Sequence, residues 1–389
     1  MTAYSNQILI VGADRVMPKL FYFAGCWARQ DTGFTVYSHD IGEDAQGHAA
    51  RFGARIEPSP PHSRNPLRLL KDFAWLFAAL RRTRYRHAEL YCDYHMLASL
   101  GYLLLLWLMR VPVVVWFRGE LYDWPVFTWW QRGFVRLAVR LGSVVVLKES
   151  YMAQTLRDAG ISAEAKTVHL HNTIPLPEAG QKPFDGPRLD LVFVNMFKNW
   201  RNVPFCIDIA VALRERTIPF SMRIIGDKPD EPALDEVARE LRAGIATHGL
   251  ESLVTVEPFT TQPQAIFGAG ELFILPADLI YCNYALLEAM GHGLIPLVFD
   301  QDEDYRQIIE DDVSGFGLPL DAEQWAETIA MLHADRDTAR TMSHAARQRI
   351  IDKFTVDAMF DRYSSLVVPL WKPRSKDRQN EQITSIKRT

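Results

Sequence analysis

The sequence predicts an α/β protein made of two domains, each a parallel β-sheet covered by helices. Its 389 residues exceed the usual ~100–200 residues of a single domain. Short apolar runs alternate with helical patterns in both halves, which is typical of parallel strands buried on both faces. Residues 173–190 (TIPLPEAGQKPFDGPRLD) are rich in Pro and Gly and lack periodicity. This stretch is predicted to be the linker.

In the first half, the runs predicted as strands are residues 7–13, 33–40, 88–94, 111–117, 143–149 and 166–172. In the second half they are residues 189–197, 220–227, 253–259, 271–277 and 294–300, with helices around 203–215 and 232–247. The predicted domains are residues 1–177 and 178–352, both Rossmann-like. A C-terminal helix, 353–372, is expected to pack back on the first domain, and residues 373–389 are expected to form a disordered tail.

Composition limits the class of protein. The first residues lead directly into a strand-like run, so no signal peptide is predicted. The longest apolar run, residues 96–109, is shorter than the ~20 residues of a membrane span, and we expect a buried helix there. The four cysteines are widely spaced, which predicts a reduced, cytoplasmic protein without a structural metal.

Charge is distributed unevenly between the predicted domains. Residues 1–177 contain 20 Lys and Arg against 14 Asp and Glu, whereas residues 178–372 contain 18 against 31. The two domains are therefore expected to have different partners. Because the second half is strongly acidic, nucleic-acid binding is not predicted.

The stretch CNYALLEAMGHGLIPLVFD, residues 282–300, carries the first candidate site. Asn283 is a good N-cap for the helix that follows. The backbone N–H groups of Tyr284, Ala285 and Leu286 would be the unpaired first donors of that helix and would attract an anion such as phosphate. Glu288 lies one turn deeper on the same side as Tyr284, where a carboxylate suits a ribose diol. The alternative is an ordinary solvated glutamate.

This region, residues 275–320, resembles the donor-binding region of glycosyltransferase family 4. The residues that carry the resemblance are Leu287–Met290, Gly293, Pro296, Ile309 and Gly315. Residues 193–213, 223–227, 113–122 and 169–175 resemble further landmarks of the family. The likeness covers roughly residues 7–370. It implies the GT-B fold, in which two Rossmann-like domains face each other across a cleft and a C-terminal helix returns to the first domain.

The resemblance also implies roles for individual residues. Glu288 would hold the donor ribose, the amides ahead of it the diphosphate, and Gly226 would end a donor-domain strand. Lys198 and Arg201 would neutralise the diphosphate, as electrostatic stabilisation of a departing anion requires; the alternative is surface charge. The chain departs from the family at Ile280, where a first glutamate is usual, and Asp278 is the nearest carboxylate. Cys282 is expected to be a packing residue.

The first domain offers candidates for acceptor binding and catalysis. Arg118 and Glu120 follow a predicted strand, where they could contact substrate or simply pair with each other. Gly12, Asp14 and Arg15 form the loop after the first strand. A basic amphipathic pattern spans residues 66–87, with apolar positions 70, 73, 74, 77 and 80, and a basic, Trp-containing cluster spans 127–142. Contact with an anionic membrane is favoured there over ordinary solvated helices.

The sequence therefore predicts a cytoplasmic hexosyltransferase, with peripheral contact at the inner face of the membrane. It would transfer a sugar from a UDP- or GDP-sugar to a glycan or lipid-linked acceptor in cell-surface polysaccharide synthesis. Retention of the anomeric configuration is implied by the resemblance. No metal or other cofactor is expected, because no metal-binding DxD motif is visible. The alternatives are an inverting GT-B transferase, a nucleotide-sugar epimerase of the same fold, or a non-catalytic scaffold.

Overall fold

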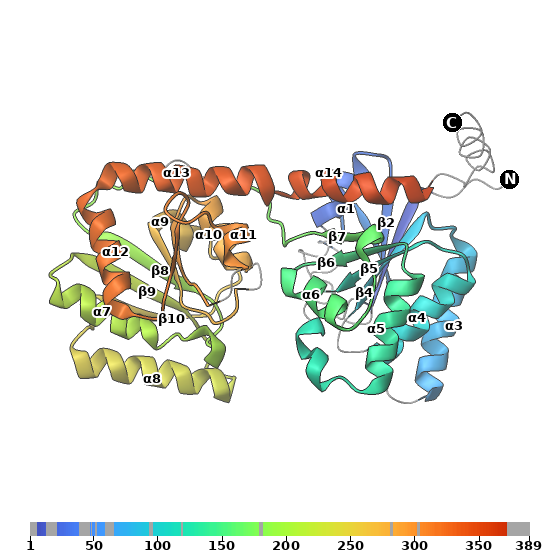
Figure 1. The fold of residues 1–389 in the computed structure, drawn as a ribbon, viewed down its shortest axis with the longest axis horizontal. Coiled ribbons are helices and arrows are strands. Elements are labelled where there is room, and N and C mark those ends of the chain that lie inside the picture. The colour runs from blue at the N-terminus through green and yellow to red at the C-terminus, as the bar shows by residue number, and fades with distance from the viewer. Residues whose placement is uncertain are drawn as a thin grey trace. The chain divides into compact units, whose positions relative to one another are not determined.

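The computed structural model describes residues 6–12, 22–38, 47, 49–50, 53–58, 66–92, 96–117, 120–178, 182–280, 283–301 and 304–371. The chain divides into two compact units (Figure 1). The first comprises residues 1–170 and 359–389, and the second comprises residues 171–358. The predicted division lies between residues 177 and 178, and the predicted disordered tail lies outside the described residues.

The described part of the first unit contains a seven-stranded parallel sheet in the order β3-β2-β1-β4-β5-β6-β7. Each strand is a short apolar run, so helices must cover both faces. The strands are β1 (Gln7–Val11), β2 (Gly33–Ser38), β3 (Ala54–Pro58), β4 (His87–Cys92), β5 (Val113–Phe117), β6 (Val144–Leu147) and β7 (Thr167–His169). The helices are α1 (Tyr22–Ala28), α3 (Pro66–Arg82), α4 (Met96–Leu108), α5 (Trp129–Leu141), α6 (Ser150–Asp158) and the 3-10 turns η2 (Glu120–Val126) and η3 (Glu164–Lys166).

Strand β4 shows how the two faces of this sheet are covered. Successive side chains point to opposite faces. Ala88, Leu90 and Cys92 belong to the hydrophobic core under α3, α4 and α5. His87, Glu89 and Tyr91 point the other way, toward α1 and the C-terminal helix α14 (Val356–Val367), which is followed by the 3-10 turn η5 (Val368–Trp371).

The C-terminal helix is held by buried aromatic rings and one buried carboxylate. Phe360 packs edge-on against Trp27, with ring centroids 4.6 Å apart. Tyr363 donates its hydroxyl to Glu89 Oε1 at 2.5 Å, and Tyr91 donates to Glu89 Oε2 at 3.4 Å. Burial, reinforced by the Glu89 carboxylate, raises the pKa of Tyr363 well above its usual value. The return of this helix to the first unit, predicted from the sequence, is confirmed.

The second unit contains, among the described residues, a six-stranded parallel sheet in the order β10-β9-β8-β11-β12-β13. The strands are β8 (Leu189–Val194), β9 (Phe220–Asp227), β10 (Val254–Pro258), β11 (Leu272–Leu275), β12 (Ile295–Phe299) and β13 (Phe316–Leu318). The helices are α7 (Phe205–Glu215), α8 (Pro232–His248), α9 (Gln264–Ala269), α10 (Tyr284–Gly291), α11 (Tyr305–Ile308), α12 (Ala322–Ala334), α13 (Arg336–Lys353) and the 3-10 turn η4 (Asn199–Arg201).

Two short edge strands have no counterpart among the predicted strands. In β3 the sequence ARIEP is half-buried or exposed throughout, because the strand pairs only with β2. In β13 three residues pair with β12 alone. Neither run is long or apolar enough to stand out, since an edge strand does not have to be buried on both faces.

One prediction about the first-unit helices is wrong in part, and the apolar positions predicted for residues 66–87 divide between the core and the surface. The apolar run 96–109 forms α4, but Leu97, Leu104, Trp107 and Leu108 are exposed rather than buried. In α3 the buried side chains include Leu76, Ala79 and Leu80, whereas Leu70, Ala74 and Phe77 of the predicted apolar face are exposed. Periodicity could not identify the inner face because both faces contain apolar residues. No helix among the described residues is long and apolar enough to cross a membrane.

Candidate functional site

In the second sheet, the order in which strands are added reverses between β8 and β11. This switch point defines the candidate site. From β8 the chain builds outward through β9 and β10, whereas β11, β12 and β13 continue on the other side. In such sheets, ligands bind beyond the carboxyl ends of the strands where the order reverses. The loops that follow β8 and β11 therefore face the same space. They carry Lys198, Arg201 and Asp278 of the predicted residues.

Arg201, on the loop after β8, is a buried cation with unused donors. Its exposed fraction is 8%, and its guanidinium lies over the ring of Trp200, 4.2 Å from the ring centroid. Its Nε and Nη1 atoms are buried and have no hydrogen-bond partner among the described residues. Burial lowers the pKa of Arg201 to about 10, so the group is still charged at neutral pH. An uncompensated buried charge is costly, which indicates a place prepared for an anion.

The loop that carries Arg201 is tied to the loop after β11. Asn202, in the left-handed conformation (φ 49°), donates its side-chain amide to the Pro276 carbonyl at 2.9 Å and to Asp278 Oδ1 at 2.6 Å. The Asp278 N–H donates to the Trp200 carbonyl at 2.9 Å. Three hydrogen bonds thus bring Arg201 and Asp278 onto adjoining loops. Lys198 belongs to the same turn, because the Arg201 N–H donates to its carbonyl at 2.9 Å, and its side chain is exposed.

Gly226 lies where the ends of β8 and β9 approach closely. A Cβ atom there would be 1.8 Å from the Asn195 carbonyl oxygen, so only glycine fits. Nearby, the buried Asn195 Nδ2 and Asp227 Oδ1 atoms have no hydrogen-bond partner, while Arg242 pairs with Asp227 Oδ2. Sequence reasoning missed Asn195, Asn202 and Asp227. For Asn195 and Asp227 the signal was a polar residue at or just after the end of a buried strand, whereas Asn202 ends the 3-10 turn η4 and carried no such signal.

The N-terminus of α10 corrects one part of the predicted anion site. Asn283 is the N-cap, as predicted, but its Oδ1 accepts hydrogen bonds from Ala285 N at 2.9 Å and Leu286 N at 3.4 Å. The amides of Ala285 and Leu286 are therefore not the unpaired donors that were expected. A phosphate at this helix end would have to displace the Asn283 cap, which makes Arg201 the better-prepared anion ligand.

Further along α10, Glu288 is half-buried, one helical turn after Tyr284. Ile280, where the resemblance predicts a carboxylate, is fully buried, so it packs in the core and offers no polar group. Cys282 lies outside the described residues.

In the first unit, the structure describes only part of the predicted set. Gly12 has φ 80°, and a Cβ atom there would lie 2.4 Å from the Tyr91 carbonyl oxygen. This glycine is thus required by packing against β4. Asp14, Arg15 and Arg118 lie outside the described residues. Glu120 begins η2, but its side chain is not among those described.

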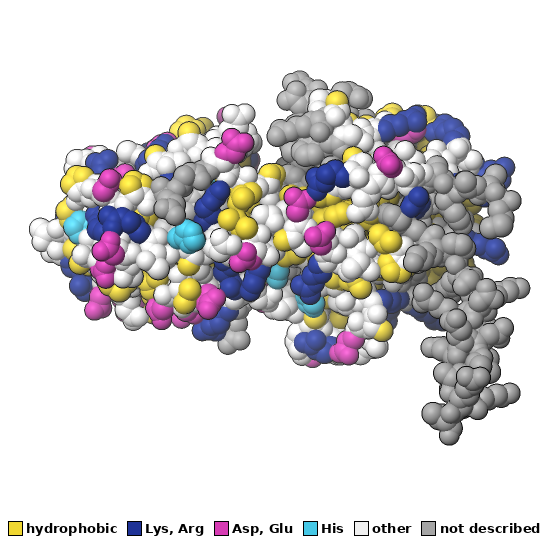
Figure 2. Space-filling model, turned by 90° about the horizontal axis from the view of Figure 1, so that it is seen from above, with side chains coloured by type: hydrophobic (Ala, Val, Ile, Leu, Met, Phe, Trp, Pro, Cys, Tyr) yellow, Lys and Arg dark blue, Asp and Glu magenta, His cyan; other side chains and the backbone are white. Residues whose placement is uncertain are grey.

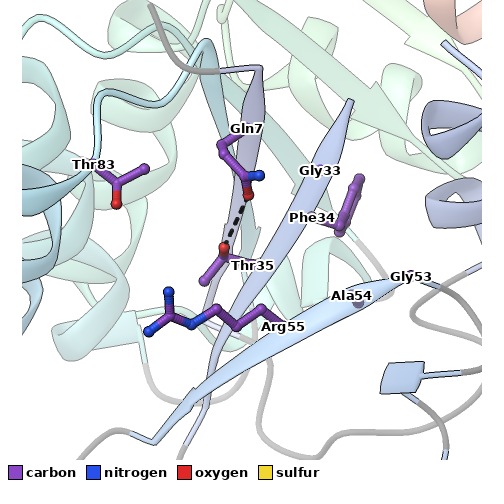
Figure 3. Close-up of a pocket in the computed structure, with 8 residues that line it drawn as sticks. All are labelled: Gln7, Gly33, Phe34, Thr35, Gly53, Ala54, Arg55 and Thr83. Carbon is purple, nitrogen blue, oxygen red and sulfur yellow. Dashed lines mark hydrogen bonds between the residues drawn. The ribbon is translucent and has the colours of Figure 1, made fainter. Parts of the chain in front are cut away.

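A cavity of about 380 Å³ opens at the amino ends of the strands of the first sheet (Figure 3). It is lined by the first residues of β1, β2 and β3, and within it Thr35 donates to Gln7 Oε1 at 3.4 Å. The amino ends of parallel strands are not where ligands of such sheets bind. The described residues include no group of three or more His, Cys, Asp or Glu side chains that could hold a metal ion.

Comparison with protein families finds a match within the second unit. Residues 188–335 match the family model described as "Glycosyl transferases group 1". The second unit carries a group 1 glycosyltransferase domain. Both loops of the candidate site and the whole of α10 lie within the matched residues. No curated protein matches the sequence.

Solved structures show that the similarity in fold extends over the whole chain. A glycosyltransferase from Rickettsia africae matches with a TM-score of 0.76 at 13% identity, over 96% of this chain and 100% of that one. HepE from Anabaena, in complex with UDP and glucose, matches with a TM-score of 0.73 at 16% identity, over 93% and 99%. Sucrose-phosphate synthase from Thermosynechococcus elongatus matches with a TM-score of 0.70 at 14% identity, over 94% of this chain and 98% of that one. The chain therefore has the GT-B fold, and the predicted enzyme class, a glycosyltransferase, is confirmed; the resemblance to family 4 in particular stays a prediction.

Proposed function

We propose that the protein transfers a hexose from a UDP- or GDP-sugar to a glycan or lipid-linked acceptor in cell-surface polysaccharide synthesis, with retention of configuration. One observation carries the donor site. Arg201 is a buried guanidinium with unused donors, at the switch point of a group 1 glycosyltransferase domain. A diphosphate would supply the missing acceptors, because guanidinium groups match phosphate oxygens with directed, charge-assisted hydrogen bonds.

In the proposed reaction, the bond between the sugar C1 and the diphosphate oxygen breaks, and the nucleoside diphosphate leaves. The acceptor hydroxyl forms the new C1–O bond on the same face and gives its proton to the departing phosphate oxygen. Arg201 and Lys198 would stabilise the negative charge that develops there. Glu288 would accept hydrogen bonds from the ribose, and Asp278 would contact the sugar. No protein nucleophile is needed.

The ligands found in structures of similar fold agree with this donor class. HepE was solved in complex with UDP-glucose, and the pneumococcal O-GlcNAc transferase GtfA with UDP and GlcNAc. The acceptor is proposed to bind the first unit, with Gly12, Asp14, Arg15, Arg118 and Glu120 as the candidate residues. The protein is proposed to act in the cytoplasm at the inner membrane face, without a metal ion.

Thermal stabilisation by a panel of nucleoside diphosphates and nucleotide sugars tests the donor site. UDP or GDP is expected to raise the Tm of the wild-type chain, and Glu288→Ala is expected to abolish this shift. Arg239→Met is the matched control, because Arg239 is an exposed residue of α8 paired with Asp235. An unchanged nucleotide shift in Glu288→Ala would show that the ribose lies elsewhere.

Turnover is tested by release of nucleoside diphosphate with and without a membrane lipid extract, and by the anomeric configuration of the product. Release that depends on the extract supports transfer. A product with the opposite configuration would establish an inverting transferase, and conversion of the donor without any acceptor would establish an epimerase.

A non-catalytic scaffold is the second candidate. It is favoured by Ile280, a fully buried apolar residue at the position where the resemblance implies a carboxylate. Nucleotide binding without turnover of any donor would support it.

A further inference from the structure

Helices α3 and α4 carry the largest set of outward apolar side chains that we find on the first unit. They pack beside each other on the same face of the sheet, with α5 next to α4 (Figure 1). Their inner residues, among them Leu76, Tyr102 and Leu103, belong to the core. The outward residues are Leu67 (72% exposed), Leu70 (66%), Trp75 (54%), Phe77 (41%), Leu97 (50%), Leu104 (42%), Trp107 (56%) and Leu108 (69%). We refer to these eight side chains as the α3–α4 surface.

An ordinary helix on a water-soluble α/β unit turns polar residues outward. Helix α4 instead contains no charged residue between Met96 and Leu108, so its outer side is apolar along its whole length. Adjacent exposed leucines and tryptophans on two neighbouring helices form an interaction site rather than scattered surface residues.

The charges around this surface identify the partner. Helices α3, α4 and α5 contain one acidic residue in their sequences, Asp72. It is 2% exposed and accepts hydrogen bonds from Tyr37 at 2.9 Å and Tyr102 at 2.5 Å, so it presents no charge outward. Exposed cations lie on these helices or directly after them: Lys71, Arg81, Arg110 and Arg140. The partner must therefore be apolar in its interior and anionic at its surface.

The tryptophans fit the same partner. Trp75 and Trp107 lie in the α3–α4 surface, and Trp129, at the start of α5, is 86% exposed. Indole rings favour the boundary between headgroups and acyl chains, where one side is apolar and the other is wet. A nucleic acid would use the cations but would leave the leucines in water.

We propose that the α3–α4 surface inserts in the plane of an anionic phospholipid bilayer. Leu70, Leu104 and Leu108 enter the acyl boundary, and Lys71 and Arg81 reach the headgroups. The proposal deepens the peripheral membrane contact of the proposed function, and its role in bringing the enzyme to an acceptor rests on that function. Insertion differs from attachment by charge alone. Because salt screens the cations but not the buried apolar contacts, vesicle binding is expected to persist in part at high salt.

The test is co-sedimentation of the full chain with vesicles of phosphatidylcholine alone or of phosphatidylcholine with phosphatidylglycerol. The double variant Leu70→Glu, Leu104→Glu places two carboxylates in the acyl boundary. It is expected to lose at least about tenfold in affinity for the anionic vesicles. The matched control is Val313→Glu, Met331→Glu, which changes two exposed apolar residues of the second unit and is expected to bind as the wild type does.

A third variant separates insertion from charge. Lys71→Gln, Arg81→Gln is expected to reduce the preference for anionic over neutral vesicles while leaving part of the binding in high salt. Equal loss of vesicle binding in the control pair, or no vesicle binding by the wild type, overturns the proposal. So does a wild-type dimer that the Leu70→Glu, Leu104→Glu chain no longer forms, because the α3–α4 surface would then be occupied by a second copy.

Nucleotide-induced thermal stabilisation, measured without vesicles, keeps this inference separate from the donor site. If Leu70→Glu, Leu104→Glu loses vesicle binding and keeps the nucleotide shift, the inference stands. If the wild type binds vesicles but no nucleotide, the proposed function fails while the inserted surface remains.

Discussion

Each of the two units contains a buried charged residue, and the two residues differ in how many hydrogen-bond partners they have. Glu89 of the first unit is 1% exposed and accepts hydrogen bonds from the hydroxyls of Tyr363 and Tyr91. Arg201 of the second unit is 8% exposed, yet its Nε and Nη1 atoms have no partner. A satisfied charge joins two parts of the fold, whereas an unsatisfied one marks a ligand site. The number of partners, rather than burial, distinguishes architecture from function.

The largest expected effect comes from removing a hydrogen-bond partner of Glu89. Tyr363→Ala removes a fully buried ring and leaves Glu89 without its shortest hydrogen bond, so the free energy of unfolding is expected to fall by about 3–5 kcal/mol. Urea unfolding measures it. Leu366→Ala, an exposed position on the same helix, is the control and is expected to change little. A loss below about 1 kcal/mol in Tyr363→Ala would show that α14 is not held through this contact.

A third buried group, the imidazole of His292, extends the comparison, because burial favours its uncharged form. Burial, with Lys182 and Arg347 nearby, lowers the pKa of His292 to about 4, compared with about 6.5 in an unfolded chain. The unfolded state binds this proton as pH falls from about 6.5, and the folded state does not until about 4. Stability is therefore lost across this window. His292→Gln is expected to reduce the loss by up to roughly 3 kcal/mol.

This expectation is measured by urea unfolding at several pH values across the window. His248→Gln, at an exposed position in the same unit, is the matched control. Parallel pH curves for the His292→Gln variant and the wild type would contradict the assignment of this acid sensitivity to His292.

Replacing the unsatisfied charge has two effects of opposite sign. Arg201→Met removes the guanidinium that would bind diphosphate and is expected to weaken UDP or GDP binding roughly 10- to 100-fold. The nucleotide-free chain is expected to be as stable as the wild type or more so, because an uncompensated buried charge is gone. Calorimetric titration and thermal unfolding measure the two effects. A destabilised variant with unchanged nucleotide affinity would make Arg201 architectural, like Glu89.

The smallest expected effect concerns Asn202, whose hydrogen bonds tie the loop that carries Arg201 to the loop after β11. Asn202→Ala removes the hydrogen bonds to Pro276 and Asp278 and places alanine at φ 49°. A loss of about 1–2 kcal/mol in stability is expected, together with weaker nucleotide binding. Asn202→Gly removes the same bonds without the conformational cost and is expected to lose less. If both variants bind nucleotide as the wild type does, the tie between the two loops does not position Arg201.

The sequence predicted the alternation of strands and helices because buried parallel strands are continuous apolar runs. It predicted the Asn283 cap, which the structure confirms, whereas Arg201 and Asp278 were singled out by the family resemblance, and their roles stay predictions. It did not predict that Asn283 would occupy the amides of Ala285 and Leu286, since that depends on one side-chain rotamer. Nor did it show which side of α3 faces the core, because Leu70 and Leu76 are equally apolar and only the sheet beneath distinguishes them.

The outer surfaces of the two units differ as well. Figure 2 shows acidic and basic side chains intermixed on the visible face of the second unit, as expected for a surface exposed to water. Helices α3, α4 and α5 of the first unit instead combine exposed leucine and tryptophan with cations alone. The charge difference seen along the chain is therefore also a difference between these surfaces.

The first unit is built from two separate parts of the chain, which affects the order in which the two units fold during translation. Residues 171–358 form one uninterrupted unit, whereas the first unit needs residues from 359 onward. During synthesis, Trp27 of α1 and Trp116 of β5 are translated early, but they gain their contacts with Phe360 and Tyr363 only after the second unit has been made. The nascent chain thus completes its second unit before its first. Between those two moments, aromatic side chains that the folded chain buries are exposed to water, which favours aggregation.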